Sequence, residues 1–128
     1  MLRRFAPAAL PAAFLAPLLA LGLSAGSASA APSASETSLA GVSPDNIAGL
    51  LNFCTQVEYI SYDEGNPPLD GLIAKYHSVN MTGGSKDYAI GTAGMLNHNG
   101  TNFDIKTLPL EQKKAVCASA VKAAQPLL

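Results

Sequence analysis

The sequence predicts an all-α fold, a small bundle of three to four short helices with one disulfide between the first and the last helix. Apolar residues recur at helical spacing in two long segments, and clusters of glycine and proline separate the segments. The chain has only two cysteines, one in each of these segments. Tryptophan is absent and other aromatic residues are few, so aliphatic side chains and alanine must fill the core.

Residues 1–30 have the order of features of a cleavable secretory signal peptide. Arg3 and Arg4 give a positive start, and an uncharged apolar stretch and a run of small residues follow. Ala28 and Ala30 supply the small-x-small pattern that signal peptidase reads, which predicts cleavage after Ala30. A retained membrane anchor is the alternative, because a spanning helix needs about 20 apolar residues. Prolines within the stretch favour removal, so we expect a periplasmic or secreted protein without a membrane anchor.

The composition of the mature part limits its partners. Six lysines stand against nine acidic residues, which gives a formal charge of −3, and both arginines lie in the signal. A mildly acidic domain without a basic cluster is a poor ligand for phosphate backbones, so we expect no nucleic-acid binding. The remaining length allows one domain, which we place at 43–128.

The mature part is predicted to begin with a flexible leader and a first helix. Residues 31–42 are rich in serine and alanine and cannot bury enough apolar area to order themselves. Ser43 can cap a helix, and Pro44 suits its first position. The apolar residues that follow are Ile47, Leu50, Leu51, Cys54 and Val57. They fall on one helical face, which predicts a helix over 44–59.

The middle of the chain predicts two shorter helices. A turn-rich connector over 61–68 is followed by a short apolar stripe, for a helix at about 68–78. The segment 86–96 is predicted to be a short helix, although Gly91 and Gly94 would each weaken it by roughly 1 kcal/mol relative to alanine. These glycines could instead allow close approach of another helix.

The last third of the chain predicts a tight turn and a final helix. Asn99 and Gly100 favour a turn, because both residue types tolerate a positive φ. Thr107 is predicted to cap the last helix, with Pro109 in its first turn. The helix should end near Gln125, before a proline.

The two cysteines predict one disulfide, Cys54–Cys117, because an exported chain oxidises paired thiols. A reactive or metal-binding thiol pair is the alternative. The wide spacing differs from a C-x-x-C motif and both cysteines fall on apolar faces, which favours the structural bond. The chain-entropy estimate for a loop of this size is about 4 kcal/mol.

Three stretches suggest a family. They are Asn-Ile-Ala-Gly-Leu-Leu-Asn-Phe-Cys at 46–54, the spaced glycines within 88–96, and Leu-Glu-Gln-Lys-Lys-Ala-Val-Cys at 110–117. With the signal and the serine-rich leader, this layout resembles the YjjA-like family of small exported bacterial proteins, whose domain has no known function. The resemblance implies a helical periplasmic protein with a cysteine pair. It carries over no catalytic or ligand-binding residue.

The residues predict a protein that is not an enzyme and holds no cofactor. His77 and His98 fall at the end of an element or in a loop, where a solvated histidine is usual. By elimination we expect a non-catalytic binding or interaction module of the cell envelope, with an unknown envelope protein or a small ligand as partner. Tyr59, Ile60 and Tyr62 are the candidate interaction surface, since tyrosine is favoured at contacts. The alternative is that these three residues close the core.

Two other functions compete with this hypothesis. A metal-binding module could use the acidic and histidine loops, but Asp70 and His77 lie seven residues apart rather than the four of paired helical ligands. No calcium-loop pattern is present either, and no metal residue is assigned. A hydrolase would need a serine next to a histidine, and no serine lies in a G-x-S-x-G setting.

Overall fold

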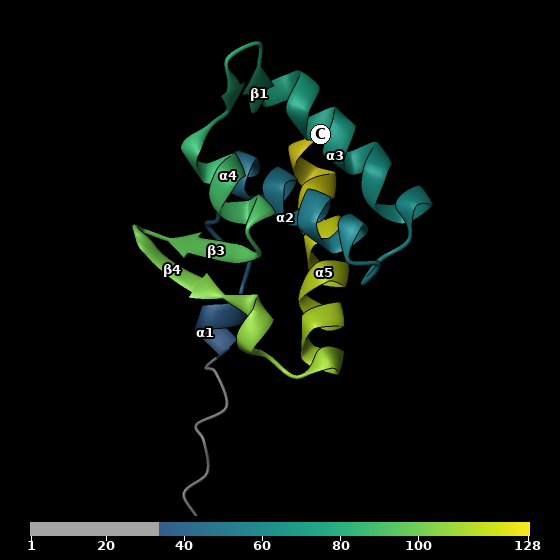
Figure 1. The fold of residues 1–128 in the computed structure, drawn as a ribbon, viewed down its shortest axis with the longest axis vertical. Coiled ribbons are helices and arrows are strands. Elements are labelled where there is room, and N and C mark those ends of the chain that lie inside the picture. The colour runs from purple at the N-terminus through teal and green to yellow at the C-terminus, as the bar shows by residue number, and fades with distance from the viewer. Residues whose placement is uncertain (1–33) are drawn as a thin grey trace, which may run out of the picture. The chain divides into compact units, whose positions relative to one another are not determined.

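A computed structural model describes residues 34–128, and within this range the chain is mostly helical (Figure 1). A single helical turn, α1, precedes four longer helices, α2 to α5, which share one core. Two short antiparallel hairpins pair β1 with β2 and β3 with β4. The elements are α1 Ala34–Thr37, α2 Pro44–Gln56, α3 Tyr62–Tyr76, β1 Val79–Asn80, β2 Gly83–Gly84, α4 Lys86–Thr92, β3 Met95–His98, β4 Thr101–Asp104, the 3-10 turn η1 Ile105–Thr107, α5 Leu110–Ala124 and the 3-10 turn η2 Gln125–Leu127.

Helix α2 is the central element and packs against α3, α4 and α5. The Ser43 side chain caps it by accepting a hydrogen bond from the N–H of Asn46 at 3.1 Å, as the sequence predicts. We expected the helix to run to Tyr59, but it ends at Gln56. Glu58 has a φ of +60°, and a right-handed helix cannot continue through a residue with a positive φ.

Helix α3 begins at Tyr62, earlier than the start near residue 68 that the sequence predicts. The Ser61 side chain caps it by accepting from the N–H of Glu64 at 3.2 Å. Pro67 and Pro68 therefore lie inside the helix rather than in a connector. Their missing N–H groups deprive only the carbonyls of the first turn, and the residues there are exposed, so water can solvate those carbonyls.

Helix α4 is shorter than the predicted 86–96, because it stops at Thr92 and the chain turns at Gly94, whose φ is +80°. The expectation of close helix packing is confirmed at Gly91. A Cβ atom there would lie 2.4 Å from the carbonyl oxygen of Asn46, so the backbones of α2 and α4 touch at this point. Gly94 does not lie in a helix, and its positive φ allows the turn that follows α4.

The segment after α4 forms the β3–β4 hairpin, which the all-α expectation did not include. Leu96 pairs with Phe103 across it. Asn99 and Gly100 make its turn with φ values of +52° and +91°, which confirms the predicted tight turn.

Helix α5 is capped differently from the prediction. Pro109, rather than Thr107, occupies the N-cap position, and no side chain caps the helix there. Thr107 lies in η1, and its hydroxyl donates to the carbonyl oxygen of Asp104 at 2.7 Å. The helix ends at Ala124 and continues as η2, close to the predicted end.

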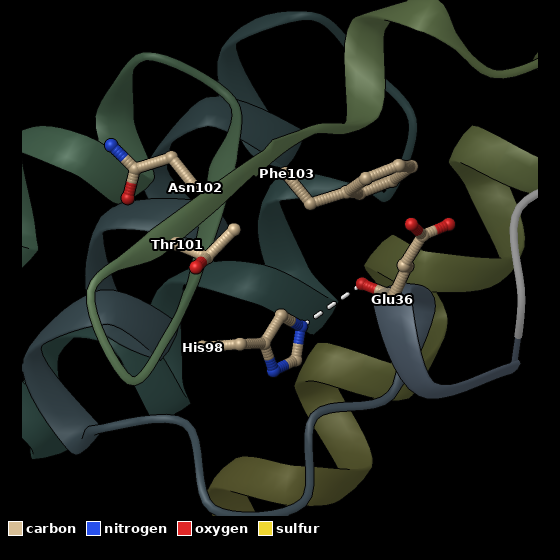
Figure 2. A pocket seen from close by; sticks show the side chains of 5 residues that line it. All are labelled: Glu36, His98, Thr101, Asn102 and Phe103. Carbon is tan, nitrogen blue, oxygen red and sulfur yellow. Dashed lines mark hydrogen bonds between the residues drawn. The ribbon is translucent and has the colours of Figure 1, made fainter.

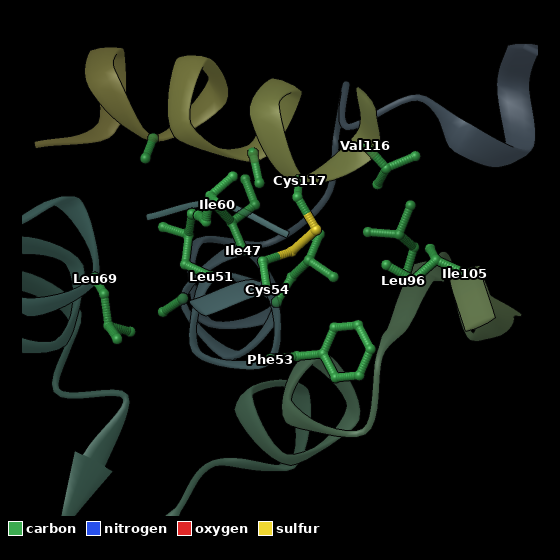
Figure 3. Close-up of a cluster of buried hydrophobic side chains, with 14 of the residues drawn as sticks. Ile47, Leu51, Phe53, Cys54, Ile60, Leu69, Leu96, Ile105, Val116 and Cys117 are labelled. Atoms are coloured by element: carbon green, nitrogen blue, oxygen red, sulfur yellow. A yellow bond between two sulfur atoms is a disulfide. The ribbon is translucent and has the colours of Figure 1, made fainter. Parts of the chain in front are cut away.

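The predicted disulfide is confirmed and lies inside the core (Figure 3). It joins the last turn of α2 to the middle of α5, and both Cys54 and Cys117 are fully buried. Aliphatic side chains surround it, as the composition indicates. The largest fully buried ones are Ile47, Leu50, Leu51, Leu72, Leu96 and Ile105. The helical bundle stapled between its first and last long helices is therefore shown.

Residues 34–42, part of the leader predicted over 31–42, lie within the range that the structure describes. They include α1, and Val42 is buried with its N–H donating to the carbonyl oxygen of Leu39 at 3.2 Å. The predicted signal peptide, with Ala28 and Ala30 at its cleavage site, lies outside the described residues. Among the helices from residue 34 onward, none combines the length and the apolar character needed to cross a membrane.

Candidate functional site

The three residues predicted to form an interaction surface do not share one environment. Ile60 is only 8% exposed and packs in the core, because the chain turns inward after α2. Tyr59 is half-buried, with its ring edge-on to Phe53 at 6.1 Å between centroids. Tyr62, the first residue of α3, is 66% exposed. Ile60 thus closes the core, as the alternative interpretation holds, and only Tyr62 presents a large surface.

A shallow groove lies between the start of α3 and the outer side of α5. Its volume is about 250 Å³. Ile60, Ala118 and Val121 provide apolar walls, and Glu64 and Lys122 provide one charge of each sign. The groove holds no cluster of acid–base groups, and its chemistry suits an apolar contact with a polar rim.

A second pocket, of about 330 Å³, lies between α1 and the β3–β4 hairpin (Figure 2). Nε2 of His98 lies 2.9 Å from the carbonyl oxygen of Glu36, so this ring nitrogen acts as the donor. Phe103 lines the same pocket, together with Thr101 and Asn102. The histidine therefore ties α1 to the hairpin, which is a structural role.

Asn46 is fully buried and holds three elements together. Its side-chain amide nitrogen donates to the carbonyl oxygens of Asp87 at 3.2 Å and Met95 at 3.1 Å. Its side-chain oxygen accepts from the N–H of Asn97 at 3.0 Å. Ser43 adds a bond from its hydroxyl to the Asp87 carboxylate at 2.8 Å. These bonds fix α4 and β3 on the first turn of α2 and satisfy a polar group that would otherwise destabilise the core.

Groups that could do acid–base or metal chemistry are dispersed. His77 is exposed at the C-cap of α3, and His98 is engaged with α1. Within residues 34–128, no three or more His, Cys, Asp or Glu side chains gather where they could hold a metal ion. Burial raises the pKa of Tyr88 above its usual value, which keeps this phenol neutral.

Among the residues whose exposure the structure describes, the most exposed large apolar side chain lies on the β1–β2 hairpin, for which the sequence predicted no site. Met81 at its tip is fully exposed, and Val79 is 38% exposed. The sequence signal that could have found it is the run over 76–85, which contains no Asp, Glu, Lys or Arg. Methionine is enriched at protein interfaces relative to the rest of the surface, and charged residues are depleted at the centres of interfaces.

No family model matches the chain. A comparison with characterised proteins finds the alcohol dehydrogenase 15 kDa subunit of Gluconobacter oxydans (strain 621H), which is 51% identical over 89 residues. The match covers 69% of this chain and 67% of that subunit.

This finding corrects two expectations from the sequence. The resemblance to the YjjA-like family of unknown function is wrong, because the chain is 51% identical over 89 residues to a dehydrogenase subunit. The function expected by elimination, an uncharacterised binding or interaction module of the envelope, is wrong for the same reason. Its two alternatives, the metal-binding module and the hydrolase, are overturned with it.

Proposed function

Because the chain belongs to the family of the alcohol dehydrogenase 15 kDa subunit, we propose that it is the small subunit of an alcohol dehydrogenase of the bacterial envelope. Its partners are the other subunits of that enzyme. The observation that carries the proposal is the 51% identity over 89 residues, which extends through two thirds of each chain.

Export supports a location on the periplasmic side of the membrane. The signal features of residues 1–30 predict secretion, and the mature chain contains a disulfide. Disulfides persist in the periplasm and are rare in the cytosol, where thiols are kept reduced. A subunit with this bond is suited to an enzyme that faces the periplasm.

A non-catalytic role within the enzyme fits the distribution of reactive groups. Both histidines are far from a nucleophile–base arrangement, since His77 faces solvent and His98 binds a main-chain carbonyl. The buried polar network around Asn46 holds helices together and faces no pocket described above. The catalytic subunits would supply the oxidation chemistry, and this chain would supply a rigid surface for their assembly.

The test is recovery of the enzyme through this chain. The full-length chain, carrying an affinity tag after Leu128, is expressed in its own host and extracted from the envelope with a mild detergent. We expect larger subunits of an alcohol dehydrogenase to co-purify in fixed stoichiometry, and the eluate to oxidise alcohols with an artificial electron acceptor. An equally tagged, unrelated exported protein is the control. Recovery of the chain alone, with all alcohol-oxidising activity in the unbound fraction, would contradict the proposal.

A further inference from the structure

The β1–β2 hairpin is clamped at its base. Ser78 is fully buried, and its hydroxyl donates to Oδ1 of Asp45 at 2.5 Å, in the first turn of α2. The carbonyl oxygen of Ser78 accepts from the N–H of Ser85 at 2.8 Å. Ser85 is also the N-cap of α4, where its side chain accepts from the N–H of Tyr88 at 3.2 Å. Both ends of the hairpin are therefore fixed to helices of the core.

The hairpin is also ordered along its length. Val79 pairs with Gly84, and Asn80 pairs with Gly83. The side-chain oxygen of Asn80 accepts from both the N–H and the hydroxyl of Thr82, at 2.8 and 2.6 Å, which closes the turn. A Cβ atom at Gly84 would come within 2.6 Å of the Tyr88 ring, so this strand rests directly on that ring.

This rigid support holds Met81 in solvent. Figure 1 shows the loop after β1 pointing away from α2, α3 and α4. The ordered turn gives the Met81 side chain no apolar contact within the domain, and the residue is fully exposed. Residues 78–85 include no Asp, Glu, Lys, Arg or His, so covering the tip would desolvate no ionisable side chain of the hairpin itself. An ordered, uncharged projection with an apolar end has the character of the buried centre of a protein interface.

We propose that Met81 is an anchor that inserts into an apolar, uncharged pocket of another subunit of the dehydrogenase. This inference rests on the proposed function and adds the surface through which the subunit docks. Asn80, Thr82 and the outer edges of the short strands offer hydrogen-bonding groups around the anchor, which a protein rim can satisfy. Hydrocarbon cannot satisfy them, so a protein pocket is favoured over a lipid bilayer.

The experiment uses a Gluconobacter oxydans strain that lacks its own 15 kDa subunit and carries an affinity tag on a remaining subunit of the dehydrogenase. The untagged full-length chain is titrated onto the purified enzyme, and the Kd is measured. Met81→Ser should weaken capture by roughly 10- to 100-fold, the range expected for a fully buried methionine side chain. Met81→Leu should bind almost as the wild type does, because it keeps an apolar anchor of similar volume.

Leu110→Ser is the matched control, because Leu110 is 51% exposed and lies in another element, at the start of α5. We expect it to leave the Kd within about twofold. Circular dichroism and thermal melting establish that each variant folds, which is expected because Met81 makes no core contact. Equal weakening by the two serine variants would overturn the assignment of Met81.

The outcomes separate this inference from the proposed function. Capture of the wild type together with unchanged capture of the folded Met81→Ser variant would overturn the anchor and leave the subunit role standing. Failure of the wild type to bind at all would overturn both. Vesicles of phosphatidylethanolamine and phosphatidylglycerol test the lipid alternative. If Met81→Ser abolished binding to these vesicles without changing subunit capture, the tip would be a membrane contact and the proposal would be wrong.

Discussion

Reduction of the Cys54–Cys117 disulfide should lower the free energy of unfolding by about 4 kcal/mol. The bond spans a sequence separation of 63 residues. A loop of that length reduces the entropy of the unfolded chain by roughly 14 cal/mol/K, which gives this value at 25 °C. The two Cα atoms are 5.7 Å apart, within the ordinary range of about 4.4–6.8 Å, so the folded backbone accommodates the bond. Small domains have total stabilities of about 5–15 kcal/mol, so reduction should remove much of the stability.

The assay is urea denaturation of the mature domain, followed by circular dichroism with and without reductant. With a slope of about 1–2 kcal/mol per molar urea, the midpoint should fall by roughly 2–4 M. The control is the double variant Cys54→Ala/Cys117→Ala, whose midpoint should be low and insensitive to reductant. A shift of under about 1 kcal/mol in the wild type would refute the reasoning, because it would mean that the unfolded chain gains little freedom when the bond opens.

Three further perturbations test the contacts around α2. Gly91→Ala should destabilise the domain by about 1–3 kcal/mol in urea, reversing the usual gain from alanine in a helix, because its Cβ would meet the backbone of α2. Asn46→Leu should cost roughly 2–4 kcal/mol, because three partly buried backbone groups lose their hydrogen-bond partner, whereas the control Asn52→Ala, which loses one exposed bond, should cost under about 0.5 kcal/mol. The raised pKa of Tyr88 means that the folded state keeps its proton after the unfolded state has lost it, so stability should decline as pH rises above about 10. Tyr88→Phe should flatten that decline in melts between pH 9 and 11.

Local sequence patterns were sufficient to predict the cap of α2, the disulfide and the turn at Asn99–Gly100. Ser43 caps α2 because its side-chain oxygen accepts a hydrogen bond from the N–H of Asn46, which has no partner within the helix. The disulfide followed from two cysteines on apolar helix faces in a chain whose signal features predict export. The turn at Asn99–Gly100 followed from two residues that tolerate a positive φ.

The errors occurred where the position of a residue in the fold overrides a local rule. Pro67 and Pro68 normally end a helix, but in α3 the carbonyls that lose their donors belong to exposed residues of the first turn, where water can solvate them, so the helix continues. Gly94 follows Gly91 at a spacing that suggests helix packing, and its actual role depends on the hairpin that comes next.

The candidate site was harder to predict than the fold. An apolar residue such as Ile60 can belong to an interface or to the core. Its burial in the core follows from the inward turn of the chain after α2, which the sequence does not reveal. Met81 lies in a segment that lacks Asp, Glu, Lys and Arg, which marks it in the sequence, but without periodicity no pattern indicates that its turn is ordered or that the side chain is exposed. No local motif in the sequence indicated a role as an enzyme subunit, and the proposal of that role came from the 51% identity to the alcohol dehydrogenase 15 kDa subunit.

The measurement that tests the central claim most directly is functional replacement in Gluconobacter oxydans. A strain lacking its own 15 kDa subunit is supplied with this chain, and alcohol oxidation by its membranes is assayed along with the subunit composition of the purified enzyme. We predict that this chain is present in the enzyme and that the activity rises above that of the deletion strain. An exported, disulfide-bonded chain that remains outside the enzyme and leaves the activity unchanged would contradict the account.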